Sequence, residues 1–199
     1  MNRTQRVAYL PLIAFSFCLF TNTGCRMSQP SSGKNVISAA DLTSRSDAST
    51  LFLDVRPRAD YEVGHVSGAR WVDLTEWVKL AKTEADGLEH FRKWQQRIAT
   101  LGVGPDSIVR VYDDGSMIEA SRLWFILQHF CVAQASVVNG GWRALQREMT
   151  ADRIASGPPA LVSAYSGAWP ERTCGAVDVQ TRADVRRCMT AKEAKILDV

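Results

Sequence analysis

Three short apolar runs, each followed by polar residues and then by a helical pattern, constrain the fold of this chain more than any other feature. Strands that alternate with helices over short connections favour a parallel sheet whose two faces are covered by helices. We therefore expect an α/β fold with an open parallel sheet flanked by helices on both faces. The expected strands lie at 51–55, 108–112 and 136–138, and the expected helices at 88–101, 117–130 and 142–148.

The connection between the second expected strand and its helix is short. Residues 113–115, Asp-Asp-Gly, follow the strand, and Ser116 stands three residues before Glu119. That spacing is typical of a capping box, in which a hydroxyl and a carboxylate satisfy the first N–H groups of a helix. We therefore expect a helix from Met117, which leaves a loop too short to encircle an anion.

The amino terminus has the layout of an export signal. Arg3 and Arg6 precede an apolar run, Val7 to Phe20, of about 14 residues. A helix needs roughly 20 apolar residues to cross a bilayer, so cleavage after export is favoured over a stable membrane span. We predict a signal peptide at 1–25, and a flexible tether at 26–35 because that segment is rich in Ser, Pro and Gly.

Cys25 follows Gly24 at the end of the predicted signal. This resembles a bacterial lipoprotein signal, whose cysteine is acylated and becomes the first mature residue. Asn22 stands where such signals usually carry leucine, so ordinary cleavage near the same place is the alternative. Either way the domain is expected outside the cytoplasm, free in the periplasm or held on a membrane by a lipid anchor at Cys25.

The formal charge of +3 comes from the amino terminus. Arg3, Arg6 and Arg26 lie in or beside the predicted signal, and without them basic and acidic residues are equal in number, at 21 each. A neutral body without a stripe of Lys and Arg lacks the charge that neutralises phosphates. We therefore expect no nucleic acid as a partner.

Beyond the signal the cysteines are Cys131, Cys174 and Cys188, an odd number without CxxC spacing or a neighbouring histidine. This pattern gives no support for a metal site, and no cofactor is expected. In an exported protein, two alternatives remain open: a disulfide between Cys174 and Cys188, or three unpaired thiols.

The second half of the chain contains a linker and a partial repeat. The segment 157–170 has three prolines, two glycines and no charge, so we predict a linker at 157–176. Residues 36–55 contain an Ala-Asp dipeptide, a polar stretch and the run LFLDV, and residues 177–199 contain Ala-Asp, a similar stretch and KILDV. We therefore expect one domain at 36–156 and the truncated start of a second copy at 177–199.

Two groups of residues resemble the rhodanese family. The first is Asp54-Val55-Arg56 with Tyr61 and the run Gly64 to Ala69, and the second combines VYDDG at 111–115, ASRLWF at 120–125 and NGGW at 139–142. The second group is similar to the amino-terminal domain of tandem sulfurtransferases, so the resemblance implies a rhodanese-like sheet and a second such domain from 177. The residues that it marks as structural are Asp54, Tyr61, Gly64, His65, Gly68, Ala69, Gly140, Gly141 and Trp142.

The resemblance also implies a chemistry, and it implies that this domain lacks it. In active members a cysteine ends the central strand, and its thiolate takes the outer sulfur of thiosulfate or another small anionic sulfur compound. Here Asp113 occupies that position, followed by Asp114 and Gly115. A carboxylate forms no persulfide, and it repels an arriving anion by roughly 1 kcal/mol per charge pair at 4 Å in water and about 4 kcal/mol at an effective dielectric of 20. We expect no catalytic residue.

Arg56 and His65 could have either a functional or a structural role. An anion contact across a domain interface is one role for Arg56, but a salt bridge with Asp54 or Asp60 that holds the loop is favoured. We expect His65 to shape its loop through hydrogen bonds to the backbone rather than to act as acid, base or ligand.

The leading functional hypothesis is a two-domain sulfurtransferase, represented here by its degenerate first domain. The alternative is an exported binding or scaffold protein that kept the fold and lost the chemistry. The coding sequence beyond Val199 separates them: a strand ending in Tyr-Cys, with Gly and Arg closely following, supports the enzyme, and a stop codon supports the binding protein.

Overall fold

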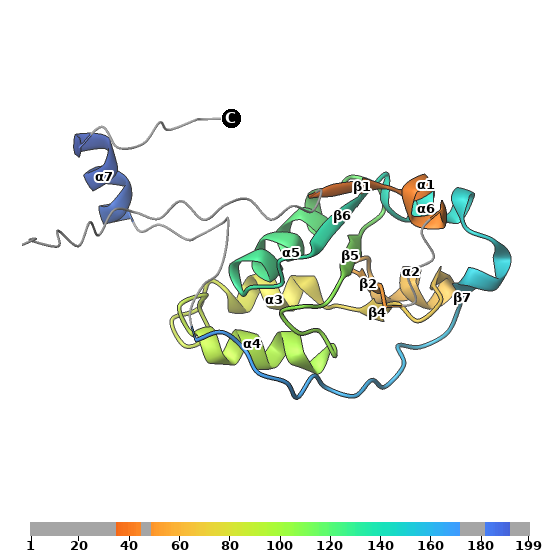
Figure 1. The fold of residues 1–199 in the computed structure, drawn as a ribbon, viewed down its shortest axis with the longest axis horizontal. Coiled ribbons are helices and arrows are strands. Elements are labelled where there is room, and N and C mark those ends of the chain that lie inside the picture. Colours follow the sequence, from red (N-terminus) through yellow and green to blue (C-terminus); the bar gives the residue numbers. More distant parts are fainter. Residues whose placement is uncertain (1–34, 45–48, 172–181, 192–199) are drawn as a thin grey trace, which may run out of the picture.

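The computed structural model describes residues 35–44, 49–171 and 182–191. Its centre is a five-stranded sheet in the order β1-β6-β5-β2-β4, and every pair of neighbouring strands is parallel (Figure 1). The strands of this sheet are β1 (Val36–Ser38), β2 (Leu51–Asp54), β4 (Arg70–Trp71), β5 (Val109–Tyr112) and β6 (Ala135–Asn139). The expected α/β class and parallel sheet are confirmed.

Helices cover both faces of the sheet (Figure 1). Ser38 caps the first of them, as its position before an Ala-Ala-Asp run suggests, because its hydroxyl accepts a hydrogen bond from the Asp41 N–H at 3.1 Å. The helices are α1 (Ala39–Ser44), α2 (Arg58–Val63), α3 (Leu74–Leu80), α4 (Phe91–Thr100), α5 (Ile118–His129), α6 (Gly141–Glu148) and α7 (Arg182–Ala191).

Two apolar clusters fill the space between the sheet and the helices α1 to α6. Successive strand residues point to opposite faces, so Leu53 lies in one cluster and Phe52 in the other. The first cluster includes Trp94 of α4 and Leu123 of α5, whereas the second includes Leu145 of α6. Because both faces are buried, the central strands carry apolar residues at successive positions, as in Leu51–Leu53 of β2, rather than only at alternate ones.

A small second sheet joins two segments that are far apart in sequence. It pairs β3 (His65–Val66) antiparallel with β7 (Ile154–Ala155). The Ser67 N–H donates to the Arg153 carbonyl at 2.8 Å, beside this pair. Strands of two residues carry no periodic pattern, which is why the sequence did not predict them.

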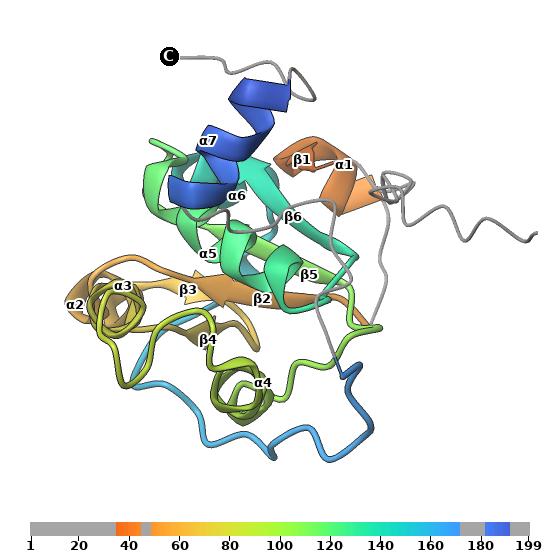
Figure 2. The same cartoon turned by 90° about the vertical axis from the view of Figure 1, so that its left-hand side faces the viewer.

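Residues 157–171, the described part of the predicted linker, run along α4 (Figure 2); we call them the strap. The Tyr165 N–H donates to the Ala99 carbonyl at 2.8 Å, and the Gln95 amide donates to the Pro170 carbonyl at 2.7 Å. The Trp169 side chain packs against the first apolar cluster. This part of the linker is therefore attached to the domain rather than free of it.

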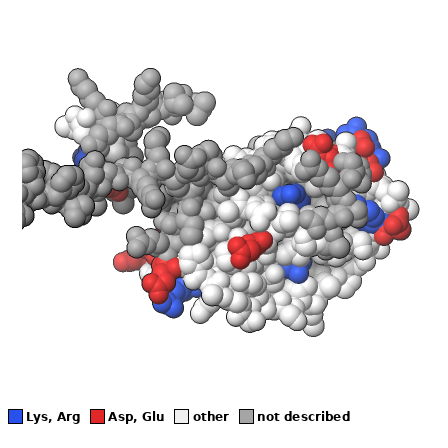
Figure 3. Space-filling view, in the orientation of Figure 1, with Lys and Arg blue, Asp and Glu red and all other residues white. Residues whose placement is uncertain are grey.

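Several predictions fall on residues outside the described ranges. These include the signal peptide at 1–25, nearly all of the tether, and the strand expected in the second copy. Helix α7 lies within the segment predicted to begin a second copy, and apart from the sheet in Figure 1. No helix within the described ranges is long and apolar enough to cross a membrane. On the face drawn in Figure 3, the described residues show small basic and acidic patches side by side, without a broad basic area.

Candidate functional site

The loop after β2 is built on a buried ion pair. Asp54 is fully buried and Arg56 is 6% exposed. Arg56 Nη2 lies 2.6 Å from Asp54 Oδ2, and the Arg56 backbone N–H donates to Asp54 Oδ1 at 2.9 Å. Arg56 Nη2 also donates to the Gly64 carbonyl at 2.6 Å. Of the two partners left open, Asp54 is therefore the correct one, while an anion contact for Arg56 stays a prediction.

Aromatic rings tie this ion pair to α6 and β5. The Arg56 guanidinium carbon lies 4.5 Å from the ring centroid of Trp142 and 5.7 Å from that of Tyr112. The two rings stack on each other at 6.1 Å. A cation over an aromatic face is attracted by the ring quadrupole, so Arg56 joins three elements. The sequence assigned Tyr112 no role, although its place directly before Asp113 was an available signal.

Two buried tyrosines surround the same pair. The Tyr61 hydroxyl donates to the Ala69 carbonyl at 2.8 Å, and the Tyr112 hydroxyl accepts from the Val66 N–H at 3.2 Å. Burial, and then the negative charge of Asp54, raise the pKa of both phenols. Both tyrosines therefore remain neutral hydrogen-bonding groups at ordinary pH.

His65 and the nearby glycines shape the turn into β3. The His65 ring stacks on Tyr61 at 3.8 Å, and its Nδ1 lies 2.8 Å from the Tyr61 carbonyl oxygen. Gly68 has a φ of +76°, a conformation that favours glycine. Gly64 is extended and lies against Trp142, because a Cβ added to it would be 3.3 Å from the Trp142 ring. The predicted role of His65, a hydrogen bond to the backbone, is confirmed.

The carboxylate of Asp113, at the end of β5, is enclosed by hydrogen-bond donors. Asp113 is 2% exposed. Its Oδ1 accepts from the N–H groups of Gly115 at 2.9 Å and Met117 at 3.1 Å. Its Oδ2 accepts from the Ala120 N–H and the Ser116 hydroxyl, both at 3.3 Å. The loop and the first turn of α5 thus form a cradle of donors around one anionic group.

This geometry corrects two sequence predictions. The capping box is wrong, because α5 begins at Ile118, the Ser116 hydroxyl accepts from the Ile118 N–H at 3.4 Å rather than from that of Glu119, and the Ser116 N–H donates to Asp114. Met117 has a φ of +63°, outside the helical region, so the loop includes it. The prediction that the loop is too short to encircle an anion is also wrong, since residues 113–117 encircle the Asp113 carboxylate.

The glycine pair before α6 allows that helix to approach the loop. Gly141 has a φ of +51°, and a Cβ added there would lie 2.5 Å from the Asp113 carbonyl oxygen and 2.6 Å from the Gly115 nitrogen. The Trp142 N–H donates to the Asp113 carbonyl at 2.7 Å. Gly140, Gly141 and Trp142 therefore hold the backbone of the loop from outside, while the donors described above hold its side chain.

Both motifs and the enclosed loop lie within residues 38–148, the range that matches the model of the rhodanese-like domain. This range covers more than half of the chain. The chain belongs to the rhodanese family. The match ends at the last residue of α6, so β7, the strap and α7 lie outside it.

Two sulfurtransferases of similar sequence are longer than this chain. It is 36% identical over 135 residues to the thiosulfate sulfurtransferase of Azotobacter vinelandii, which covers 63% of this chain and 49% of the relative. It is 30% identical over 93 residues to the 3-mercaptopyruvate sulfurtransferase of Escherichia coli, covering 45% of this chain and 32% of the relative. The chain thus spans about half, or less, of these relatives, whose named activity is sulfur transfer.

Solved structures agree on the fold. The crystal structure of SseA from Escherichia coli, described as a rhodanese fold, superposes with a TM-score of 0.61 at 20% identity over 81% of this chain and 64% of SseA. The 3-mercaptopyruvate sulfurtransferase of Leishmania major gives a TM-score of 0.58 at 22% identity, over 72% of this chain and 42% of the other. At such identity the superpositions support the rhodanese fold alone.

The described cysteines lie away from the loop that the rhodanese family uses for catalysis. Cys131 follows α5, is 4% exposed and is disulfide-bonded. Cys188, on α7, is a free thiol. Both alternatives left open by the sequence, a bridge from Cys174 to Cys188 and three unpaired thiols, are therefore wrong. Cys25 and Cys174 themselves lie outside the described ranges.

Asp114, the second acidic residue of the rhodanese loop, faces solvent. The Ser116 N–H donates to Asp114 Oδ1 at 3.0 Å. Hydrogen bonds from Ser116, and then the charge of Arg143, lower the pKa of Asp114. A hollow of about 340 Å³ beside it is lined by Arg143 and Arg147 of α6. The surface around this loop thus carries charges of both signs, while the Asp113 carboxylate is turned inward.

Proposed function

We propose that this chain is the non-catalytic first domain of a two-domain rhodanese-type sulfurtransferase, and that the second domain supplies the nucleophile. The observation that carries the proposal is the enclosed carboxylate of Asp113, which has four hydrogen-bond donors around it. Longer relatives that transfer sulfur, of which this chain matches half or less, support the two-domain arrangement. The substrates proposed for the intact protein are small anionic sulfur compounds such as thiosulfate.

The enclosed carboxylate prevents the chemistry in two ways. Sulfur transfer requires a thiolate that displaces sulfite from thiosulfate and holds the outer sulfur as a persulfide, and a carboxylate cannot do this. The N–H groups that would stabilise a bound anion are also occupied, because those of Gly115, Met117 and Ala120 already donate to Asp113. Neither the nucleophile nor an open anion site remains.

The remaining role is to support the second domain. The network of Asp54, Arg56 and Trp142 fixes the corner between β2 and α6, and the Asp113 hydrogen bonds fix the loop after β5. A rigid edge of this kind would pack against a catalytic domain and form one wall of its active cleft. In the intact protein the loop is thus a structural part of the cleft rather than its reacting group.

The complete 199-residue chain is expected to produce no thiocyanate from thiosulfate and cyanide above a protein-free control. The measurement is the colorimetric assay of thiocyanate, with the Azotobacter vinelandii thiosulfate sulfurtransferase as the positive control. Turnover that disappears when thiols are alkylated would show that a cysteine of this chain serves as the nucleophile, and would overturn the proposal.

We also propose that the protein is exported and anchored by a lipid on Cys25. The arginines and apolar run of the first 25 residues, and the Gly-Cys pair at their end, support this. Bacteria that express the chain with radiolabelled palmitate are expected to yield a labelled, membrane-associated protein, and Cys25→Ala should remove the label. An unlabelled but processed protein in the periplasm would instead identify ordinary cleavage, and an unprocessed protein in the cytoplasm would contradict export.

A further inference from the structure

A cavity of about 700 Å³ lies between α4 and the strap. The strap is fixed at both sides of it, by the hydrogen bond between Tyr165 and Ala99 and by that between Gln95 and Pro170. Between these points the Tyr165 hydroxyl closes a turn by donating to the Ala168 carbonyl at 3.4 Å. The cavity is of the size that small-molecule sites usually have, and its walls are held by backbone contacts.

Three half-buried aromatic rings line the cavity: those of Phe91, Tyr165 and Trp169. The Tyr165 and Trp169 rings meet edge to face, with centroids 5.9 Å apart. Phe91 and Trp169 pack against the first apolar cluster, and the Phe91 ring lies 5.0 Å from that of Phe130. Because the core fixes these rings, their accessible parts form a preorganised apolar surface.

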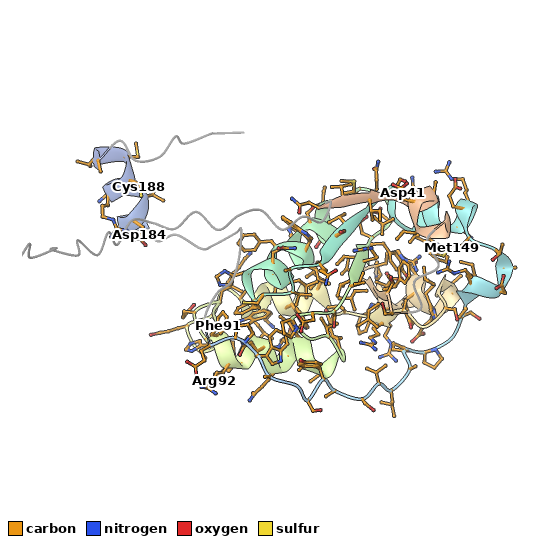
Figure 4. The ribbon with its side chains drawn as sticks, in the orientation of Figure 1. Asp41, Phe91, Arg92, Met149, Asp184 and Cys188 are labelled. Atoms are coloured by element: carbon orange, nitrogen blue, oxygen red, sulfur yellow. The ribbon has the colours of Figure 1, made fainter. Side chains whose placement is uncertain are left out.

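A cation without a partner stands beside these rings. Phe91 and Arg92 are neighbours on the first turn of α4 (Figure 4), and both line the cavity. Arg92 is exposed. Its side chain forms no hydrogen bond or ion pair with any described residue, and this includes Glu171 on the cavity wall. Lys93, by contrast, lies 3.4 Å from a carboxylate oxygen of Asp86. The guanidinium of Arg92 is thus available to a bound anion.

We propose that this cavity binds a small organic anion with a flat apolar body, such as an aromatic carboxylate. The three rings contact the body, and the planar guanidinium of Arg92 donates two parallel hydrogen bonds to the carboxylate. The site shares no residue with the loop at Asp113, so it goes beyond sulfur transfer and does not depend on it.

The test uses the complete chain with phenylacetate as the probe and phenylacetamide as its neutral counterpart. Ligand-observed NMR is expected to show saturable binding of phenylacetate, with a Kd of about 1 mM for a ligand of this size. Phenylacetamide should bind about tenfold more weakly, because it lacks the charge that Arg92 recognises. Absence of saturable phenylacetate binding up to about 10 mM would overturn the proposal.

The variant Arg92→Gln separates this site from non-specific binding. Because Arg92 is exposed and unpaired, its replacement should leave the circular dichroism spectrum unchanged while weakening phenylacetate binding about tenfold. Binding of phenylacetamide should not change. Arg122→Gln is the matched control, since Arg122 is an exposed arginine on α5 that pairs with Glu119. Equal affinity of the Arg92→Gln and Arg122→Gln variants for phenylacetate would contradict the site.

Discussion

Replacing Asp54 with alanine is expected to lower the free energy of unfolding by about 3–5 kcal/mol, the usual cost of removing one partner of a buried ion pair. The Asp54 side chain is fully buried and that of Arg56 is 5% exposed, so the variant leaves a guanidinium in the interior without a counter-charge. The same change removes the acceptor that orients Arg56 beneath the Trp142 ring. Urea unfolding of the complete chain, followed by circular dichroism, measures the difference.

An exposed ion pair in the next helix provides the control. Arg58 and Glu62 lie 2.8 Å apart on α2, with side chains that are 58% and 40% exposed. Water screens such a pair, so Glu62→Ala should change the free energy of unfolding by less than about 0.5 kcal/mol. If Asp54→Ala lowers the free energy of unfolding no more than Glu62→Ala does, the ion pair between Asp54 and Arg56 does not stabilise the interior as described.

Replacing Asp113 with alanine is expected to lower the free energy of unfolding by about 2–4 kcal/mol, because several buried donors lose their acceptor at once. The N–H groups of Gly115, Met117 and Ala120 would remain around an empty space of carboxylate size. Formate has the dimensions of the deleted group, so it should occupy that space. At about ten times its dissociation constant it should restore roughly 1.4 kcal/mol.

Thermal unfolding measures this rescue. Formate is expected to raise the Tm of Asp113→Ala and not that of the unmodified chain, when chloride at equal ionic strength serves as the reference. Asp114→Ala is the control variant, because the adjacent carboxylate is exposed and its removal opens no enclosed space. A Tm of Asp113→Ala equal to that of the unmodified chain would mean that the carboxylate does not hold the loop. Rescue of both variants alike would mean that formate acts elsewhere.

The sequence alone predicted the features of this protein that depend on residues close together in the chain. In the central strands β2, β5 and β6 apolar residues stand at successive positions, as in Leu51–Leu53, and such pairs and runs are typical of a parallel sheet that is buried on both faces. The fixed spacing of two motifs was enough to predict the family.

What the tertiary structure decided is how distant groups surround each charge. Asp54 and Asp60 were equal partners for Arg56 by sequence, and burial of the loop beside Gly64 and Trp142 selected Asp54. The capping box failed because carboxylates of the loop accept from the N–H groups near the start of α5: Asp114 accepts from the Ser116 N–H and Asp113 from the Ala120 N–H. A sequence states which donors and acceptors exist. Their pairing depends on which of them folding removes from water together, because a buried polar group left unpaired costs free energy.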